Sequence, residues 1–269
     1  MTESQTSRLN PIFVIAALIL FFQYTNTNAQ VAEQTEFDKV NALRWKKVLT
    51  DDGIKDWKEN WFLDGLKAKV ENTIGGMVFS AGPIDGDDAH HAVLWTKESF
   101  EGDIKIEYEY TRMDNRQARV NILYIQATGV APNAADISEW NHLREVPSMR
   151  TYFNNINCLH ISYAAYGKTG DVEYVRARKY PRHPDKKFGL STEIPTASFD
   201  TGLFLTGETY KITAIKTAER LYFHVKGKDI EKLFSWDLKD IDPVVVGRIG
   251  LRHMYTRSSR YKNFRIYTK

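Results

Sequence analysis

TYKITAIKTAERLYFHVKGKD, residues 209–229, is the segment that decides the class of fold. Apolar and polar side chains alternate along both of its halves, and a polar turn at Ala218 and Glu219 separates them. Successive side chains of a strand point to opposite faces, so this alternation is typical of a strand with one buried face. Two such runs around a short turn predict a β-hairpin.

The same period of two recurs towards the N-terminus. In GDIKIEYEYTR, residues 102–112, Ile104 and Ile106 lie on one face and Lys105 and Glu107 on the other. Further strands are predicted at residues 119–128, 158–167 and 173–180, and a second pair of strands over residues 247–267. Many strands, few helical periods and no βαβ spacing predict an all-β fold, a two-sheet antiparallel sandwich.

Composition limits the class of protein. The chain has 269 residues, of which 42% are hydrophobic and 26% charged, as in globular proteins. A net charge of +3 is too small to favour a nucleic-acid partner, and we expect none. Cys158 is the single cysteine, so stability must come from a core rather than from internal disulfides.

The first residues have the pattern of a secretory signal. Arg8 precedes the apolar run PIFVIAALILFF, residues 11–22, and the small residue Ala29 follows. The run is shorter than the roughly 20 apolar residues of a membrane-spanning helix. We therefore expect residues 1–29 to be a signal peptide and residues 30–269 to be a single domain. That domain would be exported to the periplasm or the medium, without stable membrane insertion.

The predicted strand CLHISYAAYG, residues 158–167, carries unexpected polar side chains. Alternation places His160, Ser162 and Tyr166 on one face, and the apolar Leu159 and Ile161 on the other. We expect the apolar set to face the core, so that His160 and Tyr166 project into a groove on the opposite face. The alternative is a passive, hydrogen-bonded histidine in an ordinary sheet.

Other segments supply candidate substrate contacts. The long connection over residues 129–155 is rich in turn formers, predicts a short helix at residues 136–143, and has a length typical of functional lids. Arginine can bind a carboxylate through two hydrogen bonds, and amide side chains suit sugar hydroxyls. Ordinary surface polarity is the alternative for each of these residues. The candidates are His91, Tyr124, Gln126, Trp140, Arg150, Arg252 and His253.

No metal or cofactor is expected. The segment DGDDAHHAVLW, residues 85–95, gathers carboxylates and histidines, but without a known metal-binding spacing. Successive strand residues such as His90 and His91 point to opposite faces, which disfavours a shared ion. The sequence also lacks a P-loop, a dinucleotide fingerprint, a G-x-S-x-G motif and the paired carboxylates of retaining glycosidases.

Three segments together carry a resemblance to a known family. They are HAVLWTKESFEGDIKIEYEYTRMD, DISEWNHLREVPSMRTYFNNINCLHISYAAYG and GRIGLRHMYTRSSRYKNFRIY. Over roughly residues 40–268 the chain resembles a bacterial family of concanavalin-like jelly rolls, catalogued as domain of unknown function nineteen-sixty-one. The resemblance implies a jelly-roll sandwich similar to the laminin-G and concanavalin group. It also implies action on polysaccharides, since a similar protein is a dehydratase of oligosaccharides from ulvan, a sulfated uronate–rhamnose polymer.

This chemistry agrees with the residues identified above. Abstraction of the C5 proton of a uronate, followed by loss of the C4 substituent, needs a base, an acid and a group that stabilises the enediolate. We expect a lyase or dehydratase acting on an anionic oligosaccharide or polysaccharide, with His160 as base and Tyr166 as acid or base partner. Arg150 or Arg252 would bind the carboxylate. The expected substrate contacts are Tyr124, Gln126, Trp140, His91 and His253.

Two other functions remain open. A glycoside hydrolase on the same fold would need two convergent carboxylates, for which Glu107, Glu109 and Glu173 are available. A carbohydrate-binding protein without catalysis would rely mainly on aromatic side chains.

Overall fold

The computed structural model describes residues 30–167 and 172–269, so the predicted signal peptide lies outside the described residues. The chain divides into two compact units, residues 1–43 and residues 44–269. The described part of the first unit contains a helix over residues 30–41. Within the described ranges, no helix is both long and apolar enough to span a bilayer.

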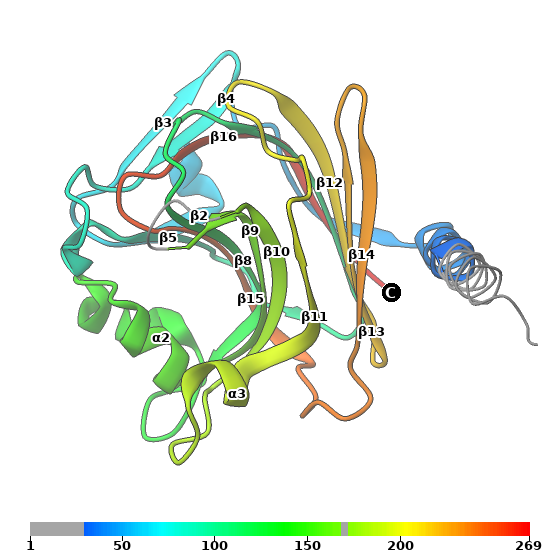
Figure 1. Cartoon of the computed structure of the whole chain (residues 1–269). Coiled ribbons are helices and arrows are strands. Elements are labelled where there is room, and N and C mark those ends of the chain that lie inside the picture. Colours follow the sequence, from blue (N-terminus) through cyan, green and yellow to red (C-terminus); the bar gives the residue numbers. More distant parts are fainter. Residues whose placement is uncertain (1–29, 168–171) are drawn as a thin grey trace, which may run out of the picture. The chain divides into compact units, whose positions relative to one another are not determined.

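The second unit contains two eight-stranded sheets, here called sheet A and sheet B (Figure 1). Sheet A has the order β14-β13-β12-β7-β16-β4-β3, and β1 also pairs with β16. Its strands are β1 (Lys46–Asp51), β3 (Lys69–Thr73), β4 (Gly76–Ser80), β7 (Ile104–Arg112), β12 (Thr209–Lys216), β13 (Arg220–Lys226), β14 (Glu231–Asp237) and β16 (Ser258–Thr268).

Sheet B has the order β11-β10-β9-β8-β15-β5-β2, and β6 also pairs with β15. Its strands are β2 (Trp61–Asp64), β5 (Ala92–Thr96), β6 (Phe100–Glu101), β8 (Arg119–Gly129), β9 (Ile156–Tyr166), β10 (Tyr174–Tyr180), β11 (Glu193–Phe199) and β15 (Val246–His253). Neighbouring strands of both sheets are antiparallel.

The predicted two-sheet antiparallel sandwich is confirmed. The hairpin over residues 209–229 forms β12 and β13, in which Lys216 pairs with Leu221 beside the predicted turn. The predicted strand over residues 102–112 becomes β7, whose exposure follows the predicted alternation in its middle, from Ile106 to Tyr110. The strands predicted over residues 119–128, 158–167, 173–180 and 247–267 are also present.

The main core lies between the two sheets. Ile106 and Tyr108 of β7 and Leu123 and Ile161 of sheet B belong to one buried hydrophobic cluster. Burial of this apolar surface is the main favourable contribution to folding. The core explains how a chain with one cysteine, the buried Cys158, is stable without an internal disulfide.

Sheet B is buried on its outer face as well. A second buried cluster joins Ile122 and Tyr124 of β8 to Trp140 and Tyr152. The helices on this side include η3 (Ile137–Arg144), α2 (Met149–Asn155) and α3 (Phe188–Thr192), and Figure 1 shows α2 and α3 outside the sandwich. The short helix predicted at residues 136–143 corresponds to η3, a 3-10 helix, whereas α2 was not predicted. Two short 3-10 helices, η1 (Trp57–Glu59) and η2 (Asp88–His90), lie in the connections before β2 and β5.

A buried carboxylate fastens residues 137–155, here called the covering segment, to sheet B. Asp64 at the end of β2 is 1% exposed. Its oxygens accept hydrogen bonds from Trp95 Nε1 at 2.8 Å, Tyr152 OH at 2.7 Å and Arg144 Nε at 2.6 Å, and from the Asn141 amide. One side chain of sheet B therefore binds three side chains of the covering segment.

We predict that Asp64→Asn destabilises the protein strongly. An amide nitrogen cannot accept a hydrogen bond, and the fully buried Arg144 guanidinium would lose its carboxylate partner. The free energy of unfolding, measured by urea denaturation, should fall by about 3–5 kcal/mol. Asp185→Asn, at an exposed loop position, is the matched control and should change little. Equal stability of the two variants would contradict the anchoring role of Asp64.

Candidate functional site

A cavity of about 310 Å³ lies on the outer face of sheet B; we call it the sheet B pocket. His160 and Ser162 of β9 and Arg178 and Tyr180 of β10 line its sheet side. The helices contribute Met149 and Phe153 from α2 and Phe188 from α3, and Arg119, Tyr166 and Tyr174 complete the polar and aromatic lining.

Strand register brings these side chains together. Tyr124 of β8 pairs with His160 of β9, and His160 pairs with Arg178 of β10. Directly paired residues of antiparallel strands point to the same face of the sheet. One rung further along, Arg252 of β15 pairs with Ile122, so it lies on this face as well. The structure therefore brings together three side chains selected from the sequence, His160, Tyr124 and Arg252.

The imidazole of His160 is neutral and has one free nitrogen. The residue is 1% exposed, and its ring centroid lies 4.7 Å from that of Tyr180 and 5.8 Å from that of Tyr124. Nε2 lies 3.4 Å from Ser162 Oγ, and Nδ1 has no hydrogen-bond partner among the described residues. Burial, followed by the charges of Arg178, Arg252 and Arg176, lowers the pKa of His160 well below its usual value.

Other buried polar groups beside His160 have few or no partners. Within the described residues, the Tyr180 hydroxyl has no hydrogen-bond partner, and the Tyr124 hydroxyl interacts only with the Arg252 guanidinium. Arg252 is fully buried, and its Nη2 donates to the Pro147 carbonyl at 2.6 Å. Burial raises the pKa of Tyr180 well above its usual value, so its hydroxyl keeps its proton. Buried polar groups are normally paired, so this concentration is typical of a region that accommodates polar ligands.

Two arginines supply positive charge to the pocket. Arg178 Nη1 donates to Thr192 Oγ1 at 2.7 Å, and its guanidinium lies 4.7 Å from the centroid of the Phe188 ring. The Arg178 guanidinium also lies 3.6 Å from the Glu193 carboxylate. Arg119 forms two hydrogen bonds with Asp85, at 2.9 and 3.2 Å. The Asp85 carboxylate therefore orients the Arg119 guanidinium. Arg178 is paired less closely, because its distance to the Glu193 carboxylate is longer.

Tyr166 lines the pocket, but not through the strict alternation that the sequence predicts. Between Ser162 and Ala165, β9 has one residue more than β10, and Ala164 has a φ of 45°. This bulge turns both Tyr163 and Ala164 into the main core, so simple alternation fails beyond Ser162. Tyr166 still lines the pocket, and its hydroxyl accepts a hydrogen bond from Arg112 Nη1 at 2.9 Å.

Seven residues selected from the sequence do not line the pocket. Two of them, Tyr124 and Arg252, lie beside it on the same face of sheet B. The other five lie elsewhere. Arg150 is exposed on α2, so of the two alternative carboxylate clamps, Arg150 and Arg252, only Arg252 lies on the same face of sheet B as the pocket. Trp140 Nε1 donates to the Ala134 carbonyl at 3.1 Å, and the Arg144 guanidinium lies 4.2 Å from the centroid of its ring, which makes Trp140 a packing residue. Gln126 is buried, and its Nε2 donates to the carbonyls of Phe100, Gly102 and Val245.

The two other selected histidines are also elsewhere. His91 is buried, its ring centroid lies 4.4 Å from that of Tyr255, and its Nε2 lies 3.2 Å from the Asp88 carboxylate. His253 faces the main core: its ring stacks on Phe79 at 4.4 Å, and Nε2 lies 2.8 Å from Tyr261 OH. Burial lowers the pKa of His253 to about 3. Neither ring lines the sheet B pocket.

Arg178, Tyr180 and Phe188 were not selected from the sequence. A usable signal existed for the first two, because alternation in EYVRARKY places Arg178 and Tyr180 on one face of a strand that follows the His160 strand. Sequential strands usually pair, which would have placed both residues beside His160. Phe188 lies in a short helix that the sequence did not predict. Across residues 30–167 and 172–269, no three His, Cys, Asp or Glu side chains are grouped as metal ligands.

Comparison with known proteins identifies the family and the fold. The family model described as Domain of unknown function (DUF1961) matches residues 47–266. No curated protein sequence matches the chain. A Bacillus subtilis protein of unknown function with a galectin-like fold superposes with a TM-score of 0.59 at 16% identity, covering 83% of this chain and 98% of that one.

Other solved structures have the same architecture. Lectin II from Ulex europaeus has a TM-score of 0.53 at 11% identity, covering 81% of this chain and 97% of the lectin. The exoplasmic domain of VIP36, solved with Ca²⁺ and Man3GlcNAc, has a TM-score of 0.51, and the match covers 80% of this chain and 89% of that one. The predicted jelly-roll sandwich is thereby confirmed.

We predict that His253 makes stability depend on pH. The folded pKa of about 3 lies below the unfolded value near 6.5, so only the unfolded state gains a proton as pH falls between these values. Stability is therefore lost on acidification through this window. Urea denaturation between pH 6 and 4 should give wild type a loss about 1.4 kcal/mol per pH unit steeper than that of His253→Gln. His183→Gln, at an exposed histidine, should keep the wild-type slope, whereas parallel curves for wild type and His253→Gln would refute the prediction.

Proposed function

We propose that this chain, which belongs to the family Domain of unknown function (DUF1961), is a carbon–oxygen lyase that acts on uronate-containing oligosaccharides in the sheet B pocket. One observation carries the proposal. The neutral, partly unpartnered imidazole of His160 lies in the same pocket as the guanidinium of Arg178. A base and a cation in one cavity are two of the three groups that the elimination needs.

The character of the pocket supports an anionic sugar as substrate. Arg119 and Arg178 lie in its lining, and the charges of Arg176 and Arg252 act on His160 from the same face of sheet B. The aromatic rings of Tyr174, Phe153 and Phe188 offer apolar surface for the carbon-bound faces of a sugar ring. Oligosaccharides of ulvan, which carry uronate and sulfate groups, are the substrates that we propose.

The elimination proceeds in two balanced stages. His160 takes the C5 proton, and the electron pair of the C–H bond moves into the uronate carboxylate to form an enediolate, which Arg178 stabilises. The pair then returns to form the C4–C5 double bond as the C4–O bond breaks, and the departing oxygen takes a proton from an acid. Departure of water makes the reaction a dehydration, and departure of a sugar makes it a chain cleavage.

Tyr166 is the acid that we propose, because it lines the pocket and a hydrogen bond orients its hydroxyl. The Tyr166 hydroxyl accepts a hydrogen bond from Arg112, and the Arg257 guanidinium lies 6.0 Å from the centroid of its ring. Burial, followed by the neighbouring Tyr124, raises the pKa of Tyr180 well above its usual value. We assign Tyr180 to orientation of the His160 ring.

We predict that His160→Gln removes the reaction. Loss of a general base should lower kcat/KM by about 10²–10⁴-fold, while substrate affinity changes little. The measurement is the ultraviolet absorbance of the unsaturated uronate, with mass spectrometry of ulvan oligosaccharides before and after incubation. His183→Gln is the matched control, because this histidine is exposed and outside the pocket lining, and it should react at the wild-type rate.

The mass spectra separate the alternatives. Loss of water indicates a dehydratase, and cleavage with a new double bond indicates a polysaccharide lyase. Cleavage that adds water would refute the elimination in favour of a hydrolase. Binding with no product would leave carbohydrate binding as the function, which is our second candidate because a lectin with this fold, at a TM-score of 0.52, was solved with galactose.

We also predict a distinctive pH profile. The charged and titratable groups that act on or contact His160 are Arg176, Arg178 and Tyr180 from β10, Arg252 from β15 and Tyr124 from β8. In the free enzyme burial and these arginines keep the His160 pKa low, so the acidic limb of kcat/KM should lie below pH 6.5. A bound uronate offsets the arginine charges, so the limb of kcat should lie at higher pH than that of kcat/KM. A kcat/KM limb at or above pH 6.5 would contradict the assignment of His160 as base.

A further inference from the structure

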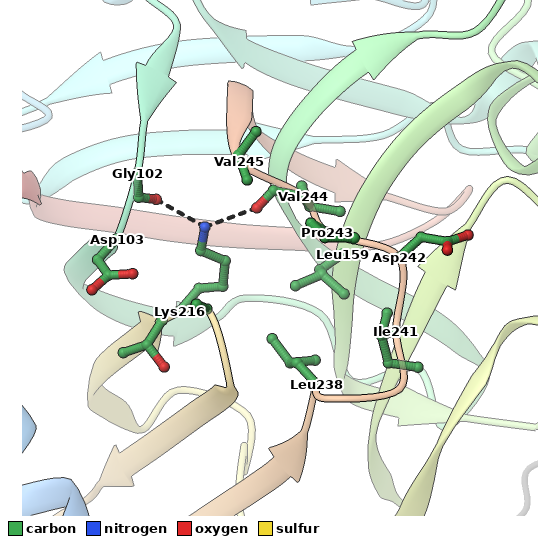
Figure 2. A pocket seen from close by; sticks show the side chains of 12 residues that line it. Gly102, Asp103, Leu159, Lys216, Leu238, Ile241, Asp242, Pro243, Val244 and Val245 are labelled. Carbon is green, nitrogen blue, oxygen red and sulfur yellow. Dashed lines mark hydrogen bonds between the residues drawn. The ribbon is translucent and has the colours of Figure 1, made fainter.

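A second cavity lies at one end of the sandwich, away from the sheet B pocket, and has a volume of about 240 Å³ (Figure 2). Its apolar walls come from Leu159 of β9 and from Leu238, Ile241 and Val244 in the connection between β14 and β15. Lys216, the last residue of β12, extends its side chain into this region. We call this space the Lys216 cavity.

The Lys216 amine is held in place by neutral acceptors. Its Nζ donates to the carbonyl oxygens of Gly102 and Val244, each at 2.8 Å. An ammonium group has three donors, so one N–H remains after these two bonds. The residue is 3% exposed, and among the described residues no carboxylate lies within ion-pair distance of the amine.

The carboxylates nearest the cavity have cations of their own. Asp103 lines the cavity but lies 4.0 Å from the Nζ of Lys269. The charge of Asp242 acts on Lys179, and in Figure 2 its carboxylate lies on the far side of the loop from Lys216. The charge of Asp103 acts on Lys216, but no ion pair or hydrogen bond joins the two side chains among the described residues. Burial lowers the pKa of Lys216 to about 8, and the charge of Asp103 opposes this shift only in part, so the amine is still mostly charged at neutral pH.

We propose that the Lys216 cavity binds a small monocarboxylate with an apolar body. The carboxylate accepts the remaining N–H of Lys216 and balances its charge, and the apolar part packs against Leu238, Ile241 and Val244. A buried charge is costly without a partner of opposite sign, which favours an anion over a neutral ligand. The cavity is smaller than typical drug-sized sites, which limits the ligand to about the size of one ring or a short chain.

The site is distinct from the proposed lyase site. The sheet B pocket and the Lys216 cavity share no lining residue. Leu159 and His160 are neighbours on β9 but point to opposite faces of sheet B, Leu159 into the main core and His160 into the sheet B pocket. Failure of either proposal therefore leaves the other intact.

Phenylacetate is the probe, and isothermal calorimetry on the full chain is the measurement. We expect saturable binding of phenylacetate, at least about tenfold weaker binding of its neutral isostere phenylacetamide, and none of acetate, which lacks the apolar body. Lys216→Met should lose phenylacetate binding. Lys239→Met, at an exposed lysine, is the matched control and should bind as wild type does.

Two further measurements keep the proposal testable if Lys216→Met does not fold. Wild-type affinity should fall as pH rises above 8, because the amine loses its charge, and binding at pH 8 should take up protons. Leu238→Trp should fill the cavity and block binding while leaving Lys216 intact. Equal binding by Lys216→Met, equal affinity for phenylacetamide, equal affinity for acetate, or no binding of phenylacetate would each overturn the proposal.

Discussion

The hydrogen bonds of Asp64 are the interaction on which the functional face depends. Without them, the outer face of sheet B would be an ordinary exposed sheet face. The carboxylate joins Trp95 on the sheet to Arg144 and Tyr152 on the covering segment, and every group in the set is buried. Tyr152 ties α2 itself to the sheet through this carboxylate. Met149 and Phe153 of the same helix line the pocket that contains His160.

The sequence predicts the strands most clearly where one face of a strand is exposed to solvent. In β7 and β12 the polar positions alternate with core positions, so the period of two is visible in the sequence. In β8 and β9 both faces are covered, and buried residues run on with little interruption. There the sequence predicts strands but does not say which face carries the function. The sequence does not predict α2, because the helix has only seven residues and lies in a segment rich in turn formers.

The candidate site was partly predictable for the same reason. His160, Tyr124 and Arg252 follow from alternation together with the order of the strands. Gln126 did not, because β8 shifts its register between Ile125 and Thr128 and Gln126 has a φ of 53°. Arg150 and Trp140 did not either, because they lie in the short helices α2 and η3, whose placement over sheet B the period of the strands does not predict. His253 followed the alternation rule, but its strand turns that position to the main core, where a neutral imidazole can hydrogen-bond to Tyr261.

The extra residue in β9 has a consequence for comparing relatives. The extra residue shifts the alternation of side chains between the two faces of the sheet. Odd and even positions therefore face opposite sides before Ser162 and after Ala165. A relative that lacks this insertion would retain His160 but would present another side chain in place of Tyr166. The number of residues at this point of β9 would then distinguish two groups of relatives. One group would have only the histidine base, and the other would have both the base and the tyrosine beside it.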